Sequence, residues 1–195
     1  MTEERTDLIG LTRAELNAAM AAIGEKPLRA RQIWHWIYGQ GATDFAAMTT
    51  LAKGLRARLA ERYVVGRPAI ARQQASADRS RKWLLRFADG NEAETVFIPD
   101  DGRGALCMSS QVGCTLTCRF CHTGTQRLVR NLIPGEMVGQ MMVARDSYDE
   151  WPSTKEDRLV SNVVMMGMGE PLFNYANVAK ALTIIMDPDG LAISR

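Results

Sequence analysis

The 195-residue sequence predicts an α/β protein, and three successive patterns along the chain support this. Residues 1–66 are typical of short helices, because apolar side chains recur there every three or four positions. Residues 67–103 consist of short strand-like runs separated by turns such as ADGN and DDGRG. Residues 104–195 alternate strand and helix patterns, as parallel β/α units do. We therefore expect a helical domain, a β connector and a β/α domain.

The helical domain is expected to hold three helices, over residues 12–24, 28–38 and 51–63. The first begins at a capping box, since Thr12 is followed three positions later by Glu15. The third has apolar side chains on one face and these basic side chains on the other: Lys53, Arg56, Arg58 and Arg62. The pattern indicates a small helical domain with a basic rim.

Further strands are expected over residues 81–88, 92–99, 105–111 and 159–166, and further helices over residues 134–148 and 174–186. Alternation places Glu94 on the same strand face as Val96 and Ile98. From the pattern alone, a strand-end glutamate that reaches solvent is the favoured interpretation. Residues 159–166 are apolar almost throughout, which predicts a strand buried on both faces. Residues 191–194 are a candidate start of another strand.

Composition excludes some classes of protein. The chain is 46% hydrophobic and 24% charged, and no run approaches the ~20 apolar residues of a membrane span. The N-terminus is charged from its third residue, so a secretory signal is not expected and the predicted location is the cytoplasm. Residues 1–82 carry 14 Lys and Arg against 8 Asp and Glu, whereas residues 83–195 carry 10 against 14. This asymmetry suggests a polyanion-binding N-terminal domain, although charge alone favours ordinary solvated helix faces.

All four cysteines lie between residues 107 and 121, which points to metal or redox chemistry in a reducing compartment. Cys114, Cys118 and Cys121 follow a C-x3-C-x2-C spacing, and three such thiolates suit zinc or iron–sulfur chemistry. A closed zinc site needs a fourth ligand, for which Cys107 and His122 are the candidates. A [4Fe–4S] cluster held by three cysteines would instead leave one iron open to a substrate. Thiolates are soft ligands that suit both metals, so the ligand type does not decide between a zinc site and a [4Fe–4S] cluster.

Two motifs resemble those of the radical S-adenosylmethionine superfamily. One is the cysteine motif with Phe120 directly before its third cysteine, and the other is Met-Gly-Met-Gly-Glu-Pro at residues 166–171. The resemblance implies the N-terminal part of a partial (β/α)6 barrel, with a [4Fe–4S] cluster and S-adenosylmethionine as cofactors. The implied cluster ligands are Cys114, Cys118 and Cys121. Gly169 would permit close backbone approach, and Glu170 would bind the amino group of the cofactor's methionine moiety.

Longer segments resemble the family that methylates adenine C2 in 23S rRNA and tRNA. They are RARQIWHWIYGQGATDF, SSQVGCTLTCRFCHTG, RNL-x-P-GE-x-VGQ and MGMGEPLFNY. The resemblance implies radical methylation of RNA, an electron donor such as a flavodoxin, and a monomeric full-length enzyme. It assigns Glu94 as proton acceptor. It assigns Cys107 to the release of the covalent protein–RNA intermediate through a disulfide.

The same resemblance implies that the cysteine that the enzyme methylates, and further cofactor contacts, lie beyond residue 195. We therefore expect this chain to be part of a longer enzyme and, alone, to be inactive and poorly stable. Basic side chains of the helical domain are expected to contact RNA phosphates, among them Lys26, Arg29 and Arg31. Trp34, Trp36 and Tyr38 are candidates for base stacking, with core packing favoured for at least one tryptophan.

Two other functions remain open at this point. One is the sister family that methylates C8 of adenine, although the N-terminal segment and QVGCTLTC favour C2. The other is a zinc-stabilised RNA-binding module without catalysis.

Overall fold

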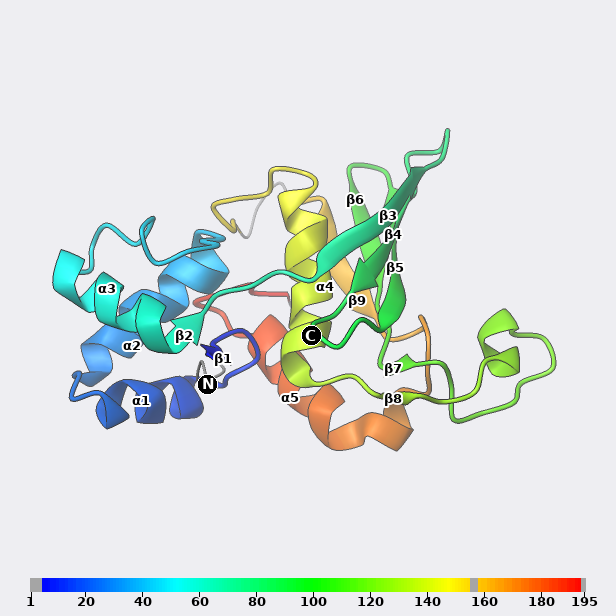
Figure 1. Ribbon diagram of the computed structural model, residues 1–195. Coiled ribbons are helices and arrows are strands. Elements are labelled where there is room, and N and C mark those ends of the chain that lie inside the picture. Colours follow the sequence, from blue (N-terminus) through cyan, green and yellow to red (C-terminus); the bar gives the residue numbers. More distant parts are fainter. Residues whose placement is uncertain (1–4, 155–157, 194–195) are drawn as a thin grey trace.

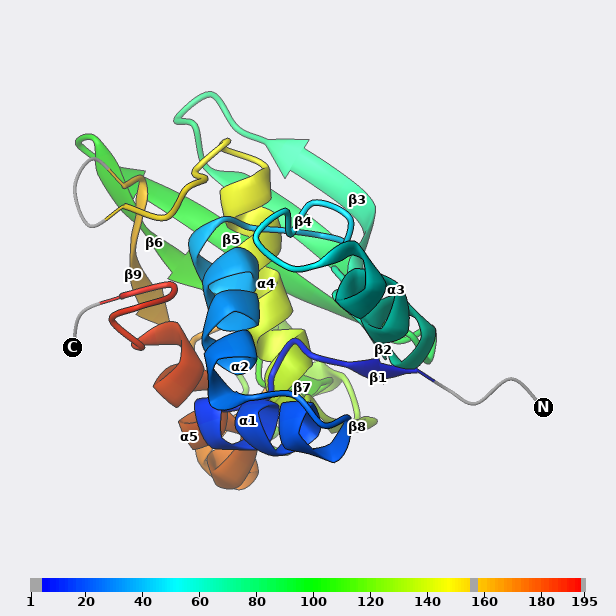
Figure 2. The ribbon, with the colours of Figure 1, turned by 90° about the vertical axis from the view of Figure 1, so that its left-hand side faces the viewer.

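The computed structural model describes residues 5–154 and 158–193. Its elements form three layers, with a group of short helices on one side, α4 (Pro134–Asp146) in the middle and a five-stranded sheet on the other side (Figures 1 and 2). We call residues 5–65 the helical module. Within the described ranges, no helix is both long enough and apolar enough to cross a bilayer.

The helical module contains the three expected helices: α1 (Arg13–Ala22), α2 (Pro27–Trp34) and α3 (Lys53–Arg62). The capping box is confirmed, because the Thr12 amide donates to Glu15 Oε2 at 2.8 Å and the Glu15 amide donates to Thr12 Oγ1 at 3.3 Å. A π-helical turn, η1 (His35–Gly39), extends α2. Strand β1 (Thr6–Asp7) pairs in parallel with β2 (Tyr63–Val64), so the two ends of the module lie together.

The large sheet has the order β3-β4-β5-β6-β9. Its strands are β3 (Ala69–Ala75), β4 (Arg81–Arg86), β5 (Glu92–Asp100), β6 (Arg103–Cys107) and β9 (Val160–Val164). The first four run antiparallel to their neighbours, whereas β9 lies parallel to β6 and is reached through α4. Together, β6, α4 and β9 form the expected strand–helix–strand unit. The short strands β7 (Gln111–Val112) and β8 (Arg130–Asn131) pair below it. The remaining elements are η2 (His122–Thr125), η3 (Pro171–Asn174) and α5 (Tyr175–Ile185).

One face of the sheet is packed against α4 and the other is open. On β5, Ala93, Thr95 and Phe97 are buried, whereas the alternate side chains are half-buried or exposed. Glu94, Val96 and Ile98 therefore share a face, as expected, and Ile98 is 51% exposed. We call this the open face of the sheet.

The expectation that residues 159–166 form a strand buried on both faces is wrong. Only Val160 of β9 is buried, and Asn162 is exposed. The reason is that β9 lies at the edge of the sheet and helices cover one face alone. Leu191 and Ile193 are buried but not in a strand, and Ser194 lies outside the described residues.

The helical module is packed tightly on α4 and α5. Gly10 has a positive φ of 90°, and a Cβ there would lie 2.3 Å from the Gly135 nitrogen at the start of α4. Arg13 donates to both carboxylate oxygens of Asp187, each at 2.6 Å, just after α5. One continuous cluster of buried apolar side chains runs through the module, α4 and α5. The module and the sheet therefore flank a shared core.

The expectation that three aromatic side chains of the helical module stack on RNA bases is wrong for two of them, Trp34 and Tyr38. Trp34 is 2% exposed and Tyr38 is fully buried, and their rings pack edge to face at 4.5 Å. The Tyr38 hydroxyl accepts a hydrogen bond from the Gly10 amide at 3.1 Å. Trp36 is half-buried and donates to Thr50 Oγ1 at 2.7 Å. Trp34 and Tyr38 therefore belong to the shared core and are not available to a base.

Candidate metal centre and cofactor site

The three motif cysteines lie on a loop that projects from the body of the protein between β7 and β8 (Figure 1). We call residues 113–129 the cysteine loop. Two glycines permit its tight path. Gly113 has a φ of 75°, and a Cβ there would lie 2.1 Å from the Arg127 carbonyl oxygen. A Cβ on Gly124 would lie 2.5 Å from the Cys118 carbonyl oxygen. Side chains at these positions would force the loop open.

The thiols of the cysteine loop are reduced and accessible. Cys114, Cys118 and Cys121 are all partly exposed, and none forms a disulfide. The backbone amide of Gly124, and then that of Thr123, lowers the pKa of the Cys121 thiol by hydrogen bonding to it. A lowered pKa favours the thiolate, which is the form that binds metal. The loop therefore presents suitable donors for a soft metal centre.

The donor set, three thiols on one short loop, suits an iron–sulfur cluster. Among the described residues, no three Cys, His, Asp or Glu side chains converge closely enough to hold one metal ion. A structural zinc requires four convergent ligands, whereas thiolates that bind separate irons of a cluster need not meet at one point. Cys107 lies at the end of β6, in the sheet, and is not part of the cysteine loop. Cys107 is therefore not placed to complete a zinc site, whereas His122, the other candidate, lies in the cysteine loop directly after Cys121.

The second motif packs directly against the base of the cysteine loop. The Ser110 amide donates to the Met168 carbonyl oxygen at 2.8 Å, and the Glu170 amide donates to Gln111 Oε1 at 3.1 Å. Gly169 has a φ of 93°, and a Cβ there would lie 2.5 Å from the Gln111 Cβ. The Glu170 carboxylate accepts from the Leu172 amide at 3.1 Å and is partly exposed. The structure thus brings residues 166–171 beside the strand that leads into the cysteine loop.

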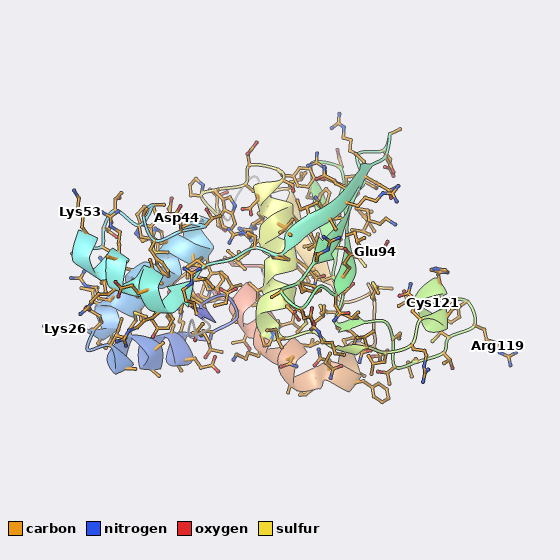
Figure 3. The ribbon with its side chains drawn as sticks, viewed as in Figure 1. Lys26, Asp44, Lys53, Glu94, Arg119 and Cys121 are labelled. Atoms are coloured by element: carbon orange, nitrogen blue, oxygen red, sulfur yellow. The ribbon has the colours of Figure 1, made fainter. Side chains whose placement is uncertain are left out.

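Glu94 and Cys107 lie on the open face of the sheet. Cys107 pairs with Val96, two positions from Glu94, and partners across antiparallel strands point to the same side. Burial raises the pKa of the Cys107 thiol, so this cysteine is held in its neutral form. Glu94 accepts a hydrogen bond from Lys82 Nζ at 2.9 Å, and both side chains remain partly exposed. Figure 3 shows Glu94 on the sheet and Cys121 out on the projecting loop.

Glu94 is also linked to residues 166–171 through its backbone. Its amide donates to Met168 Sδ at 3.4 Å, and its carbonyl oxygen accepts from Ser109 Oγ at 2.5 Å. The Ser109 hydroxyl in turn accepts from the Met168 amide at 2.9 Å. The strand that carries Glu94 and the loop that carries Glu170 are therefore held in a fixed relation.

Three buried amide side chains hold this site together, and sequence reasoning did not single them out. Gln140, on α4, accepts from Thr95 Oγ1 at 2.7 Å and from the Ser109 amide at 2.8 Å. Asn174 donates to the Ser110 and Leu132 carbonyl oxygens, each at 2.8 Å. Their only signal in the sequence is that they lie within the segments that resemble a known family.

Gln111 is the third of these amides and the most central. Its Nε2 donates to Thr115 Oγ1 at 2.8 Å, in the cysteine loop, and to Asn131 Oδ1 at 2.7 Å, on β8. Its Oε1 accepts from the Glu170 amide. One side chain thus contacts the cysteine loop, the strand that closes it and the second motif.

A solved structure defines the class of this protein. The chain is similar to a radical SAM methyltransferase from Sphaerobacter thermophilus whose crystal structure is known, with a TM-score of 0.85 and 42% sequence identity over 95% of this chain and 53% of that one. The chain therefore has the fold of a radical SAM methyltransferase, as the sequence predicted. Membership of this class implies an iron–sulfur cluster and S-adenosylmethionine as cofactors.

Sequence comparisons narrow the class. Residues 6–65 match the family described as the ribosomal RNA large subunit methyltransferase N-terminal domain. The dual-specificity RNA methyltransferase RlmN of Gluconobacter oxydans is 64% identical over all of this chain and 49% of its own length. The RlmN of Rhodospirillum rubrum is 66% identical over 97% of this chain and 44% of its own length. Over its whole length the chain is similar to these dual-specificity RNA methyltransferases, and it spans about half the length of these relatives.

Proposed function

We propose that this protein methylates C2 of adenine in 23S rRNA and in tRNA by radical S-adenosylmethionine chemistry. The match of residues 6–65 to the methyltransferase N-terminal domain supports the proposal, as do the names of the relatives to which the chain is similar. The observation that carries it is the direct packing of residues 166–171 against the base of the cysteine loop. This contact supports the assignment of a cofactor-binding carboxylate and a cluster to one site.

Within this proposal, Cys114, Cys118 and Cys121 hold a [4Fe–4S] cluster. Gly169 and Glu170 bind the methionine moiety of S-adenosylmethionine, with the carboxylate as partner for its ammonium group. The bound cluster and cofactor supply a radical that activates C–H bonds too inert for ordinary methyl transfer. Gly169 would permit close approach of the backbone to the cofactor. It also lets residues 166–171 pack on Gln111, with which a side chain at this position would collide.

Glu94 and Cys107 perform the later proton and thiol chemistry in this proposal. The Glu94 carboxylate is partly exposed on the open face, where it would accept the proton that leaves adenine C2. The sulfur of Cys107 would attack the sulfur of a cysteine, none of the four in this chain, that is bonded to the methylene carbon of the RNA adduct. The S–S bond would form as that S–C bond breaks, and the carbon would keep the electron pair and take a proton to complete the methyl group. A thiol reductant would then restore both thiols. Cys107 and Glu94 occupy diagonal positions on neighbouring strands, a separation of about 7–8 Å in such pairs.

The proposed partners are 23S rRNA, tRNA and a reductant such as a flavodoxin, in the cytoplasm, with a monomeric complete enzyme. A methyl group on C8 of adenine would instead indicate the sister activity. Mass spectrometry of RNA modified by the complete protein distinguishes these two positions.

Anaerobic reconstitution tests the cluster assignment. The complete protein should become brown and hold about four iron and four sulfide ions per chain. Cys118→Ala should abolish the colour, whereas Cys107→Ser, outside the cysteine loop, should retain a full cluster. A full cluster in Cys118→Ala would contradict the ligand assignment. A colourless protein that holds one zinc would support a zinc-stabilised module.

A further inference from the structure

A hollow of about 450 Å³ lies on the helical module, between α3 and the segment that follows η1. Asp44 and Lys53, which line it, lie at the opposite end of the molecule from Cys121 (Figure 3). We call this hollow the α3 groove. Its volume is in the range of small-ligand sites, about 300–1,000 Å³. The groove is therefore separate from the proposed cluster site.

The walls of the α3 groove are mainly apolar. Phe45 forms part of one wall, and Ala57 and Ala60 of α3 form part of the other. Ala57 and Ala60 are exposed, so short side chains leave the groove open along the helix. Such walls offer a flat, uncharged ligand a place to pack.

Positive charge surrounds the α3 groove. Arg5 is held against α3, because its Nη1 donates to the Ala60 carbonyl oxygen at 3.2 Å. Arg56 donates from Nη1 to the Ala46 carbonyl oxygen, and its buried Nε has no hydrogen-bond partner within the described part of the chain. Lys53 is exposed and makes no ion pair with any described residue. These three cations are therefore available to an anion.

Little negative charge offsets these cations. Asp44 is the one acidic residue among the described residues that line the groove, and its Oδ1 already accepts from the Ala47 amide at 2.8 Å. The groove therefore combines apolar walls with a net positive rim. This chemistry is complementary to a group that is flat and apolar on its faces and carries a phosphate beside it.

We propose that the α3 groove binds one unpaired nucleotide of the RNA substrate, with the base between the apolar walls and the phosphate on Lys53 and Arg5. The inference rests on the proposed function, because it names a contact of that RNA. Proteins that read single strands combine cations along the backbone with surfaces on which bases pack. A duplex hides its base faces, so the groove selects unpaired RNA.

The test measures RNA binding by the complete protein through fluorescence anisotropy. The probes are a labelled short single strand of mixed sequence, a strand of the same length that is abasic at every position, and a labelled hairpin duplex. Wild-type protein should bind the intact strand about tenfold more tightly than the abasic strand, since packing of one base contributes roughly this much. Equal affinity for intact and abasic strands, or for strand and duplex, would overturn the proposal.

Two variants separate the roles of charge and shape. Lys53→Ala should weaken binding severalfold and reduce the slope of log affinity against log salt by about 0.7, the loss of one phosphate contact. Ala57→Leu narrows the groove with an aliphatic side chain and leaves the charge unchanged, so this variant should bind intact and abasic strands with nearly equal affinity. Arg79→Ala is the matched control, since Arg79 is exposed in the turn between β3 and β4. If Arg79→Ala weakened RNA binding as much as Lys53→Ala, the loss would reflect the overall positive charge of the protein and not a contact in the groove. The groove assignment would then be wrong.

The RNA-binding test of the groove does not depend on whether the proposed cluster cleaves S-adenosylmethionine. Reductive cleavage of S-adenosylmethionine in the absence of RNA should be the same in wild type, Lys53→Ala and Ala57→Leu. Loss of this cleavage in the wild type would count against the proposed function, whereas RNA binding without a base-dependent component would count against the groove. Thermal melts of each variant establish that it is folded.

Discussion

At the residue scale, Gln111 is the side chain that joins the two cofactor motifs. Gln111→Met keeps a similar volume but removes its hydrogen bonds to Thr115, Asn131 and Glu170. Polar groups left without partners in a protein interior cost about 1–3 kcal/mol each. We expect the variant to retain its iron but to bind S-adenosylmethionine at least about tenfold more weakly, since 1.4 kcal/mol is a factor of ten. Titration of the reconstituted protein, followed by electron paramagnetic resonance, measures this affinity.

Gln140→Met provides the matched control for that prediction. Gln140 is also a buried amide, but its partners are Thr95 and Ser109, and it contacts neither Glu170 nor the cysteine loop. The Gln140→Met variant should therefore have a lower melting temperature but no comparable loss of affinity for S-adenosylmethionine. If both variants lost affinity in proportion to their loss of stability, Gln111 would be a structural residue and not a positioning residue.

A side chain at Gly169 would have two effects: backbone strain at a positive φ and a steric clash with Gln111. Gly169→Ala introduces a side chain at a positive φ and 2.5 Å from the Gln111 Cβ. Gly90 has a similar φ of 84°, but a Cβ there would meet no described atom within 4 Å, so Gly90→Ala reports the backbone strain alone. We expect Gly90→Ala to lower the free energy of unfolding by about 1 kcal/mol, and Gly169→Ala to lower it clearly more. Urea denaturation measures both, and equal losses would mean that residues 166–171 shift freely away from Gln111.

At the scale of elements, an ion pair joins α1 to α5. Lys180 Nζ lies 2.6 Å from Glu15 Oε1, and this hydrogen bond is the main reason that the pKa of Glu15 falls from 4.5 to about 2. A carboxyl whose pKa is lowered on folding stabilises the protein above its unfolded pKa, and this contribution is lost as the pH falls towards the folded value. Lys180→Met should therefore destabilise the protein near neutral pH, by less than about 1 kcal/mol because both side chains are partly exposed to solvent.

The pH dependence of that difference is the measurement that checks this prediction. The free energies of unfolding of wild type and Lys180→Met should converge as the pH falls from 4.5 towards about 2. A difference that stayed constant over this range would show that Lys180 acts through its aliphatic packing and not through its charge.

The elements that could be predicted from the sequence are those with local signals. The Thr12–Glu15 capping box fixes the start of α1, and Pro134 begins α4 at the first helical position. Alternation alone placed Glu94 with Val96 and Ile98, and the register of β5 agrees. Such signals depend on neighbours within a few positions, so tertiary packing did not override them.

The elements that could not be predicted depend on contacts between distant segments. An apolar run gives no sign that β9 is an edge strand with one uncovered face. Trp34 and Tyr38 are buried because distant segments cover them, among them the turn at Gly190, where a Cβ would lie 3.0 Å from each side chain. Gln111 and Glu170 meet across 59 positions, so no local pattern could have identified their hydrogen bond. Only the family resemblance placed both motifs in one site.

At the scale of the whole molecule, the helical module and the sheet are expected to unfold together. A single apolar cluster runs through both, and the Arg13 pair with Asp187 crosses the same boundary. Trp34 reports on the module and Trp83, which is fully buried in the sheet, reports on the core. In wild-type protein labelled with fluorotryptophan, the fluorine-19 resonances of Trp34 and Trp83 should give the same urea midpoint, because two probes of one cooperative transition coincide. Arg13→Ala should lower both midpoints equally, since the pair that it removes belongs to neither part alone. A module that melted first, with Trp83 still buried, would show that the contacts across α4 are too weak to couple the two parts.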